Sequence, residues 1–104
     1  MWYVVISKPL VPREKTMEHA DKNLAWMKEQ HDAARVLFSG RTTEGPGIWI
    51  LRADSKEEAA QLAQTNPWVE MGFRDVSEIY EWTVEQALGV GRFAVAQPGA
   101  APAR

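Results

Sequence analysis

The pattern of apolar and polar positions predicts four β-strands in this chain. Four segments are rich in β-branched and aromatic residues and are bounded by Gly, Pro or polar residues, which is typical of strands. The strands are expected over 2–8 (WYVVISK), 35–40 (RVLFSG), 48–53 (IWILRA) and 75–82 (DVSEIYEW).

Two helices are predicted between these strands. The first covers about residues 16 to 33, because apolar positions recur there every three or four residues. Its apolar face comprises Met17, Ala20, Leu24, Met27, His31 and Ala34. The second helix begins after Ser55, which forms a capping box with Glu58, and continues to about Gln64. Asn66 then caps a short helical turn that has Pro67 at its first position.

The order β-α-β-β-α-β predicts an α+β fold with a ferredoxin-like protomer. Both faces of the first strand are apolar, with Trp2, Val4 and Ile6 on one face and Tyr3 and Val5 on the other. Two helices can cover only one face of a four-stranded sheet, and an open face should carry polar residues. We therefore expect the sheet of a second copy to cover the other face, in a homodimer or a higher oligomer. The alternative is a monomer that uses this face as a ligand cleft.

Composition narrows the class of protein. A chain of 104 residues predicts one domain, expected over 1–90, and a disordered tail over 91–104 that ends in the Pro-rich QPGAAPAR. The net charge of −2 and the lack of a basic run argue against nucleic acid and anionic membrane as partners. Apolar runs are much shorter than the roughly 20 residues that span a bilayer. The absence of cysteine excludes thiolate chemistry and fits a cytoplasmic protein.

Several pieces of the sequence follow a recognisable order. They are WYVVI at the start, His19, WMKEQHDAARVLFSG (26–40), the third strand, SKEEAAQLAQTNPW (55–68) and the strand after Gly72-Phe73. In this order and spacing they resemble the YCII-related (YciI-like) family of the dimeric α/β-barrel superfamily, over most of residues 1–83. The resemblance implies dimerisation through the sheets and a pocket between sheet and helices. Ala34 and Arg41 stand where the resemblance leads us to expect Gly and Pro.

The resemblance also implies a His-Asp pair at the pocket, which makes His19 and Asn66 the catalytic candidates. His19 matches the family histidine, and imidazole exchanges protons near neutral pH. A solvated helix histidine without a role is the alternative. Asn66 occupies the place of the family aspartate, which is a suspected proton-transfer residue. An amide can cap a helix or orient His19, but it cannot accept a proton near neutral pH.

Aromatic and basic residues supply candidates for substrate binding. Trp26 shares a helical stripe with His19, and Trp68 follows the Asn-Pro cap, so the two indoles are expected to stack a planar ring. Arg41 could bind a carboxylate or phenolate, as could Arg52, and Tyr80 on the last strand completes the set. Core packing is the alternative for the tryptophans. His31, on the apolar helix face, is expected in the core, and no metal site or cofactor is expected.

The resemblance also implies a class of reaction, since some members of this family act on chlorinated or hydroxylated aromatic compounds, for example by dehydrochlorination. The leading hypothesis is therefore a cofactor-independent enzyme of the isomerase or lyase type that acts on a cyclic or aromatic metabolite, in degradation or specialised metabolism. Its chemistry would be proton transfer: isomerisation, loss of water or hydrogen halide, or cyclisation. The competing hypothesis is a non-catalytic homodimer that binds a small molecule or assists a larger enzyme.

Overall fold

The computed structural model describes residues 1–85, which contain four strands and four helices. In chain order these are β1 (Trp2–Pro9), α1 (Arg13–Met17), α2 (Ala20–Asp32), β2 (Val36–Arg41), β3 (Gly47–Arg52), α3 (Lys56–Gln64), α4 (Pro67–Glu70) and β4 (Arg74–Trp82). The tail expected over 91–104 lies outside the described residues.

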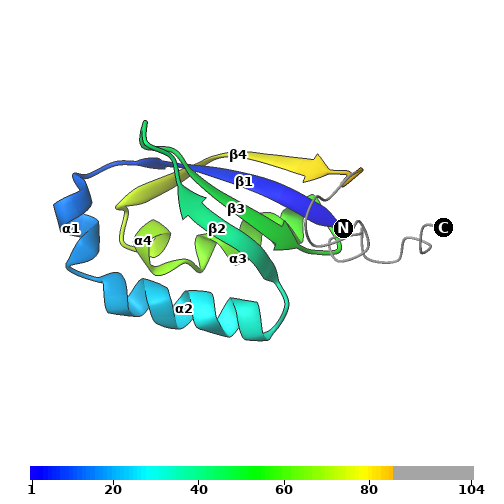
Figure 1. Ribbon diagram of the computed structural model, residues 1–104, viewed down its shortest axis with the longest axis horizontal. Helices are drawn as coiled ribbons and strands as arrows, with labels where there is room; N and C mark the ends of the chain where they lie inside the picture. The colour runs from blue at the N-terminus through cyan, green and yellow to red at the C-terminus, as the bar shows by residue number, and fades with distance from the viewer. Residues whose placement is uncertain (86–104) are drawn as a thin grey trace.

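The four strands form one antiparallel sheet in the order β2-β3-β1-β4. All four helices lie on the same side of this sheet, as Figure 1 shows. The predicted α+β, ferredoxin-like arrangement is confirmed. Within residues 1–85, no helix covers the other face of the sheet.

The core lies between the helices and the sheet. Its main cluster joins Val5 and Leu51 of the two central strands to Trp26 of α2 and Ala63 of α3. Burying a side chain such as Val5 or Leu51 contributes about 1.5–3 kcal/mol to the free energy of unfolding. These contacts fix the helices at a defined height above the sheet, and this spacing decides where a cavity can form.

The single helix expected from about residue 16 to residue 33 is divided into α1 and α2. The chain leaves the helical conformation at His19, whose φ is −121° and ψ is 27°. The carbonyl oxygen of Thr16 accepts a hydrogen bond from the indole Nε1 of Trp68 at 3.0 Å. Since this contact holds the end of α1 against α4, α1 does not continue in line with α2. A periodicity argument cannot anticipate such a tertiary contact.

The buried face of α2 also differs from the predicted one. Trp26 and Gln30 are 7% and 4% exposed, whereas Leu24 is 67% exposed, and His31 is exposed as well. The indole of Trp26 packs 5.8 Å from that of Trp49 and donates its N–H to Thr65 Oγ1 at 2.9 Å. An indole buries more apolar area than leucine, so the Trp26 stripe faces the sheet.

The C-terminus of α2 ends in a Schellman motif. The backbone N–H of Arg35 donates to Gln30 O at 2.9 Å, and that of Ala34 donates to His31 O at 3.0 Å. The motif places Ala34 at a φ of 58°, in the left-handed region that favours glycine. The Schellman motif therefore explains why the family resemblance leads us to expect glycine at position 34.

A β-bulge in β4 changes which side chains face the helices. The register with β1 shifts between Ile6 and Ser7, so Glu78 lies opposite Ile6 while Val76 lies opposite Ser7. Ser77 is the additional residue, and its hydroxyl donates to Ile6 O at 3.2 Å. Strict alternation from Ile79, which faces the helices, would make Asp75 face the helices too. The extra residue of the bulge reverses the alternation, so Arg74 faces the helices instead.

Candidate functional site

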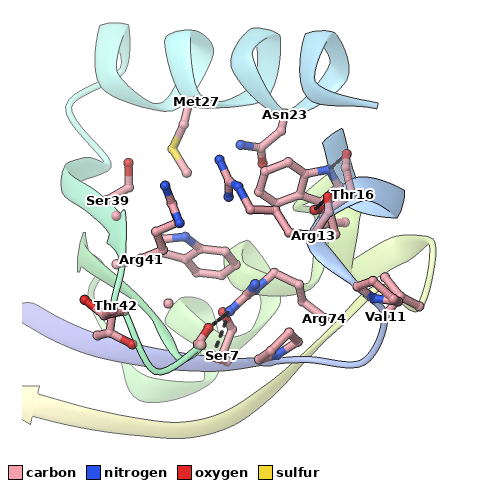
Figure 2. Close-up of a pocket in the computed structure, with 18 of the residues that line it drawn as sticks. Ser7, Val11, Arg13, Thr16, Asn23, Met27, Ser39, Arg41, Thr42 and Arg74 are labelled. Atoms are coloured by element: carbon pink, nitrogen blue, oxygen red, sulfur yellow. Dashed lines mark hydrogen bonds between the residues drawn. The ribbon is translucent and has the colours of Figure 1, made fainter. Parts of the chain in front are cut away.

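A cavity of about 590 Å³ lies between α1, α2 and the helix-facing side of the sheet. Its floor includes Ser7 of β1 with Gly47 and Trp49 of β3, and the turn between β2 and β3 forms one wall. Figure 2 shows the side chains of Asn23 and Met27 reaching into it from α2. A volume of this size is sufficient for a small organic ligand.

The floor of the cavity depends on the absence of a side chain at Gly47. Gly47 lies opposite Ser7 in the sheet. A Cβ atom at this position would lie 3.0 Å from Ser7 Oγ and 3.1 Å from Arg74 Nη2. Real Cβ atoms rarely approach other atoms so closely, so glycine leaves the room in which the Arg74 guanidinium lies.

Arg74 is held rigidly across this floor. Its Nε donates to Ser7 Oγ at 2.9 Å, while Nη2 donates to Ser7 O at 3.2 Å and to Gly45 O at 2.9 Å. Burial lowers the pKa of the guanidinium below its ordinary value, because water is partly excluded from the cation. All three acceptors are neutral oxygens, and among residues 1–85 Arg74 forms no ion pair.

Two further arginines line the same cavity. Arg13 comes from α1 and Arg41 from the end of β2. Figure 2 shows both side chains, with that of Arg74, in the space between α2 and the sheet. In the part of the chain that the structure describes, no Asp or Glu lines the cavity, and neither Arg13 nor Arg41 forms an ion pair. The cavity is therefore a locally cationic site in a protein of net charge −2.

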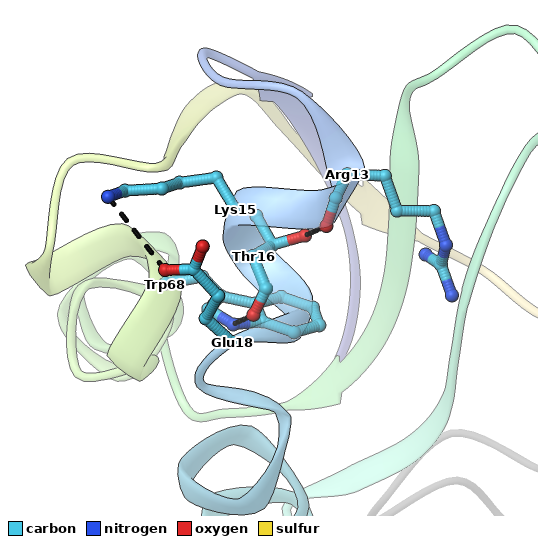
Figure 3. A network of polar contacts seen from close by, with 5 residues as sticks. All are labelled: Arg13, Lys15, Thr16, Glu18 and Trp68. Atoms are coloured by element: carbon cyan, nitrogen blue, oxygen red, sulfur yellow. Dashed lines mark hydrogen bonds and ion pairs between the residues drawn. The ribbon is translucent and has the colours of Figure 1, made fainter.

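The end of the cavity at α1 is fixed by a small polar network, shown in Figure 3. Thr16 is buried, and its hydroxyl donates to Arg13 O at 2.7 Å while its carbonyl accepts from Trp68 Nε1. The exposed side chains of Lys15 and Glu18 form an ion pair at 3.9 Å on the outer side of α1. Trp68 is thus immobilised with its ring at the cavity wall.

Asn66 supports this wall from behind and is completely buried. Its Oδ1 accepts from the backbone N–H groups of Trp68 at 3.0 Å and Val69 at 3.4 Å, which confirms the predicted helix cap. Its Nδ2 donates to Oδ1 of Asn23 at 2.8 Å, and Asn23 itself lines the cavity. Both ends of the Asn66 amide are therefore used within the protein, and an aspartate could not make the bond from Nδ2.

The structure brings two of the sequence-derived candidates together at the cavity and places the others elsewhere. Arg41 and Trp68 line it. His19 is not among the lining residues; its ring lies 5.7 Å from that of Phe73. Trp26 belongs to the core, and its ring faces Trp49. Tyr80 is exposed, and its register partner Val4 belongs to the sheet face away from the helices.

Sequence reasoning missed Arg13 and Arg74. No pattern marks Arg13, since it occupies a polar segment between β1 and α2. For Arg74, the spacing of apolar residues in β4 could have indicated its orientation. Val76 and Ile79, which pack on the core, are three positions apart. A spacing of three in a strand of period two indicates a bulge, and a bulge predicts that Arg74 shares a face with Val76.

Two further features of the described residues concern metal binding and membrane insertion. Within residues 1–85, no three His, Cys, Asp or Glu side chains gather in a way that could hold a metal ion. None of the helices in these residues is long and apolar enough to cross a membrane.

These features define an α+β domain with a ligand-sized, arginine-lined cavity between its helices and a four-stranded sheet. The model of the YCII-related domain matches residues 1–83. This chain belongs to the YCII-related family.

Comparisons with individual proteins support the fold. The structure is similar to that of 5-chloro-2-hydroxyhydroquinone dehydrochlorinase from Burkholderia phenoliruptrix, solved in complex with 2,5-dihydroxybenzoquinone. The TM-score is 0.66 at 16% sequence identity, and the match covers 79% of this chain and 93% of that chain. At this identity the similarity shows the fold alone. No curated protein sequence matches this chain significantly.

Proposed function

We propose that this protein is a small, cofactor-independent enzyme that carries out proton-transfer chemistry on a cyclic or aromatic metabolite. The observation that carries the proposal is the cavity of about 590 Å³ in which indole rings and guanidinium groups face one space. The reaction classes are isomerisation, loss of water or hydrogen halide, and cyclisation. That the structurally similar dehydrochlorinase was solved with a quinone agrees with a ring compound as the ligand.

The cavity provides two complementary surfaces for such a ligand. The indoles of Trp49 and Trp68 offer apolar faces for a planar ring. Arg41, an exposed residue of the lining, offers paired N–H donors for a ring oxygen. When a proton leaves a hydroxylated ring or lactone, negative charge develops on oxygen. A guanidinium already in place stabilises that charge, and this lowers the barrier to proton loss.

The proposed proton carrier is His19, although it lies outside the cavity lining. Its backbone N–H and the indole N–H of Trp68 donate to the same atom, Thr16 O, so His19 follows directly behind the cavity wall at α1. Asn66 would act indirectly, since its amide fixes Trp68 and Asn23. Trp26 would act through Trp49, the indole that its ring contacts.

The test is a mass-spectrometric assay of hydroxylated and halogenated aromatic acids and lactones with the purified protein. We expect turnover that depends on pH near neutrality and is lost in His19→Gln. His31→Gln is the matched control, because His31 is exposed near the end of α2 and does not line the cavity. Full activity in His19→Gln would remove His19 from the mechanism. The absence of turnover with every compound would contradict the enzymatic proposal.

A second candidate function is non-catalytic binding of the same kind of ligand. The observation that favours it is the chemistry of the lining: in the described residues, the only ionisable side chains at the cavity are Arg13, Arg41 and Arg74. Arginine remains protonated near neutral pH and is a poor general base. Binding of an unchanged ligand, unaffected by His19→Gln, would identify this function.

We also propose that the protein is a cytoplasmic homodimer in which the sheets face one another. Phe38 and Tyr80 are 57% and 53% exposed on the sheet face away from the helices. Ile50 pairs with Phe38, and Val4 pairs with both Ile50 and Tyr80, so these residues form one row across the sheet. A self-complementary apolar face of this kind is suited to a second copy of the same sheet.

A further inference from the structure

We propose that the ligand of this cavity is a ring compound that carries a carboxylate, and that Arg74 is the residue already positioned to bind it. This inference rests on the proposed function and adds the charge class of the ligand. It also moves the central binding role from Arg41 to a residue that the sequence patterns did not mark.

The hydrogen bonding of Arg74 leaves one side of its guanidinium available. A guanidinium has five N–H donors, and the bonds of Arg74 to Ser7 and Gly45 use Nε and Nη2. Within residues 1–85 no acceptor is bonded to Nη1. Partly buried arginines are normally neutralised by a carboxylate, because an isolated charge away from water is costly. Here the neutralising group is absent from the described protein and is expected on the ligand.

The position of Arg74 is built by several independent features. The bulge at Ser77 turns the side chain toward the helices, and Gly47 leaves room for its Nη2. Ser7, which is almost completely buried, holds it with both its hydroxyl and its carbonyl oxygen. An arginine that served only to anchor the β2–β3 turn would need the bond to Gly45 alone. The fixed orientation presents the two N–H donors of Nη1 for charge-assisted hydrogen bonds to an anion.

Arg13 and Arg41 add positive charge at the more exposed edge of the cavity. Three cations around one space repel one another, and an anion among them removes that repulsion. A concave site lined by one sign of charge also attracts ligands of the opposite sign. The neighbouring hydroxyl of Ser39 can donate a further hydrogen bond to a carboxylate oxygen, whereas that of Thr42 already donates to Pro46 O at 2.7 Å. The indoles of Trp49 and Trp68 then favour a flat ring over an aliphatic acid.

The experiment compares two probes that differ only at the acid group, the anionic 2,5-dihydroxybenzoate and the neutral 2,5-dihydroxybenzamide, by isothermal titration calorimetry at low salt. We expect the acid to bind the wild-type protein about 10- to 100-fold more tightly than the amide. Arg74→Gln should remove most of this preference while the affinity for the amide changes little. Arg52→Gln is the matched control, since Arg52 is an exposed arginine of β3 that does not line the cavity.

Arg13→Gln serves as a second variant if Arg74→Gln does not fold. Arg13 is exposed, and its guanidinium makes no hydrogen bond within the described residues, so its loss should leave the fold intact and still weaken binding of the acid. Equal affinity of the wild type for acid and amide would overturn the carboxylate inference and leave the proposed function standing. Acid binding that is unchanged in both variants would also overturn it. Failure of both probes to bind would count against the proposed function as well.

Discussion

The side-chain amide of Asn66 connects α4 to α2, and both of its polar atoms form hydrogen bonds within the protein. Oδ1 caps α4, and Nδ2 binds Asn23 on α2. An aspartate in this position, as the family resemblance implies for relatives, would retain the cap but could not donate to Asn23. The amide is thus matched to its structural surroundings, which explains how the position can differ from the family pattern without loss of the fold.

We predict that Asn66→Ala lowers the free energy of unfolding by about 1–3 kcal/mol, because it removes a cap and leaves buried polar groups unpaired. Asn66→Asp should cost less, since it preserves the cap. Urea denaturation measures both. Ser55→Ala is the control for the loss of a cap alone, because the Ser55 hydroxyl accepts only from the Glu58 N–H. A cost for Asn66→Ala no greater than that for Ser55→Ala would show that the bond to Asn23 contributes nothing.

Tyr3 gives the protein a specific sensitivity to alkali. Burial, followed by the negative charge of Glu81, raises the pKa of Tyr3 above its ordinary value of 10.0. The unfolded chain therefore ionises Tyr3 at lower pH than the folded protein does. The associated stability is fully present below about pH 10 and is lost as the pH rises further. Thermal melts between pH 9 and 11 should show a smaller alkaline loss for Tyr3→Phe, while the exposed Tyr80→Phe should behave like the wild type.

At the scale of elements, the end of α2 carries avoidable strain. Ala34 adopts a positive φ in the Schellman motif, and an L-residue there costs about 1–2 kcal/mol relative to glycine. We predict that Ala34→Gly raises the free energy of unfolding by about 1 kcal/mol. Ala33→Gly is the control: Ala33 has a φ of −86°, so glycine there gives no relief and should destabilise. Equal effects of the two substitutions would contradict the explanation by φ.

The secondary-structure elements also show which features of the structure can be predicted from the sequence. The order of strands and helices follows from local periodicity, and the caps at Ser55 and Asn66 follow from local hydrogen bonding, so both were predictable. The break at His19 and the burial of the Trp26 stripe depend on contacts with Thr65, Trp49 and Trp68, which are distant in sequence. The site depends in addition on the bulge in β4. For this reason Arg41 and Trp68 were found from the sequence and Arg74 was not.

At the scale of the whole molecule, both faces of the sheet are apolar but only one is covered by helices in the described residues. We predict that the protein is dimeric by size-exclusion chromatography with light scattering and that Phe38→Glu yields monomers. A charge placed in an apolar interface opposes association. Leu10→Glu is the control, because Leu10 is similarly exposed but lies beyond the end of β1. A wild-type monomer would contradict the proposed dimer.

The distribution of tryptophan gives the cavity an optical signal of its own. Trp49 and Trp68 line the cavity, and the Trp26 ring lies 5.8 Å from that of Trp49. At this separation, excitation energy absorbed by Trp26 passes readily to Trp49. A ring compound stacked in the cavity would therefore quench the emission of three indoles at once. Intrinsic fluorescence can follow ligand entry in the unlabelled protein, and Trp68→Phe would show how much of the signal comes from the cavity wall.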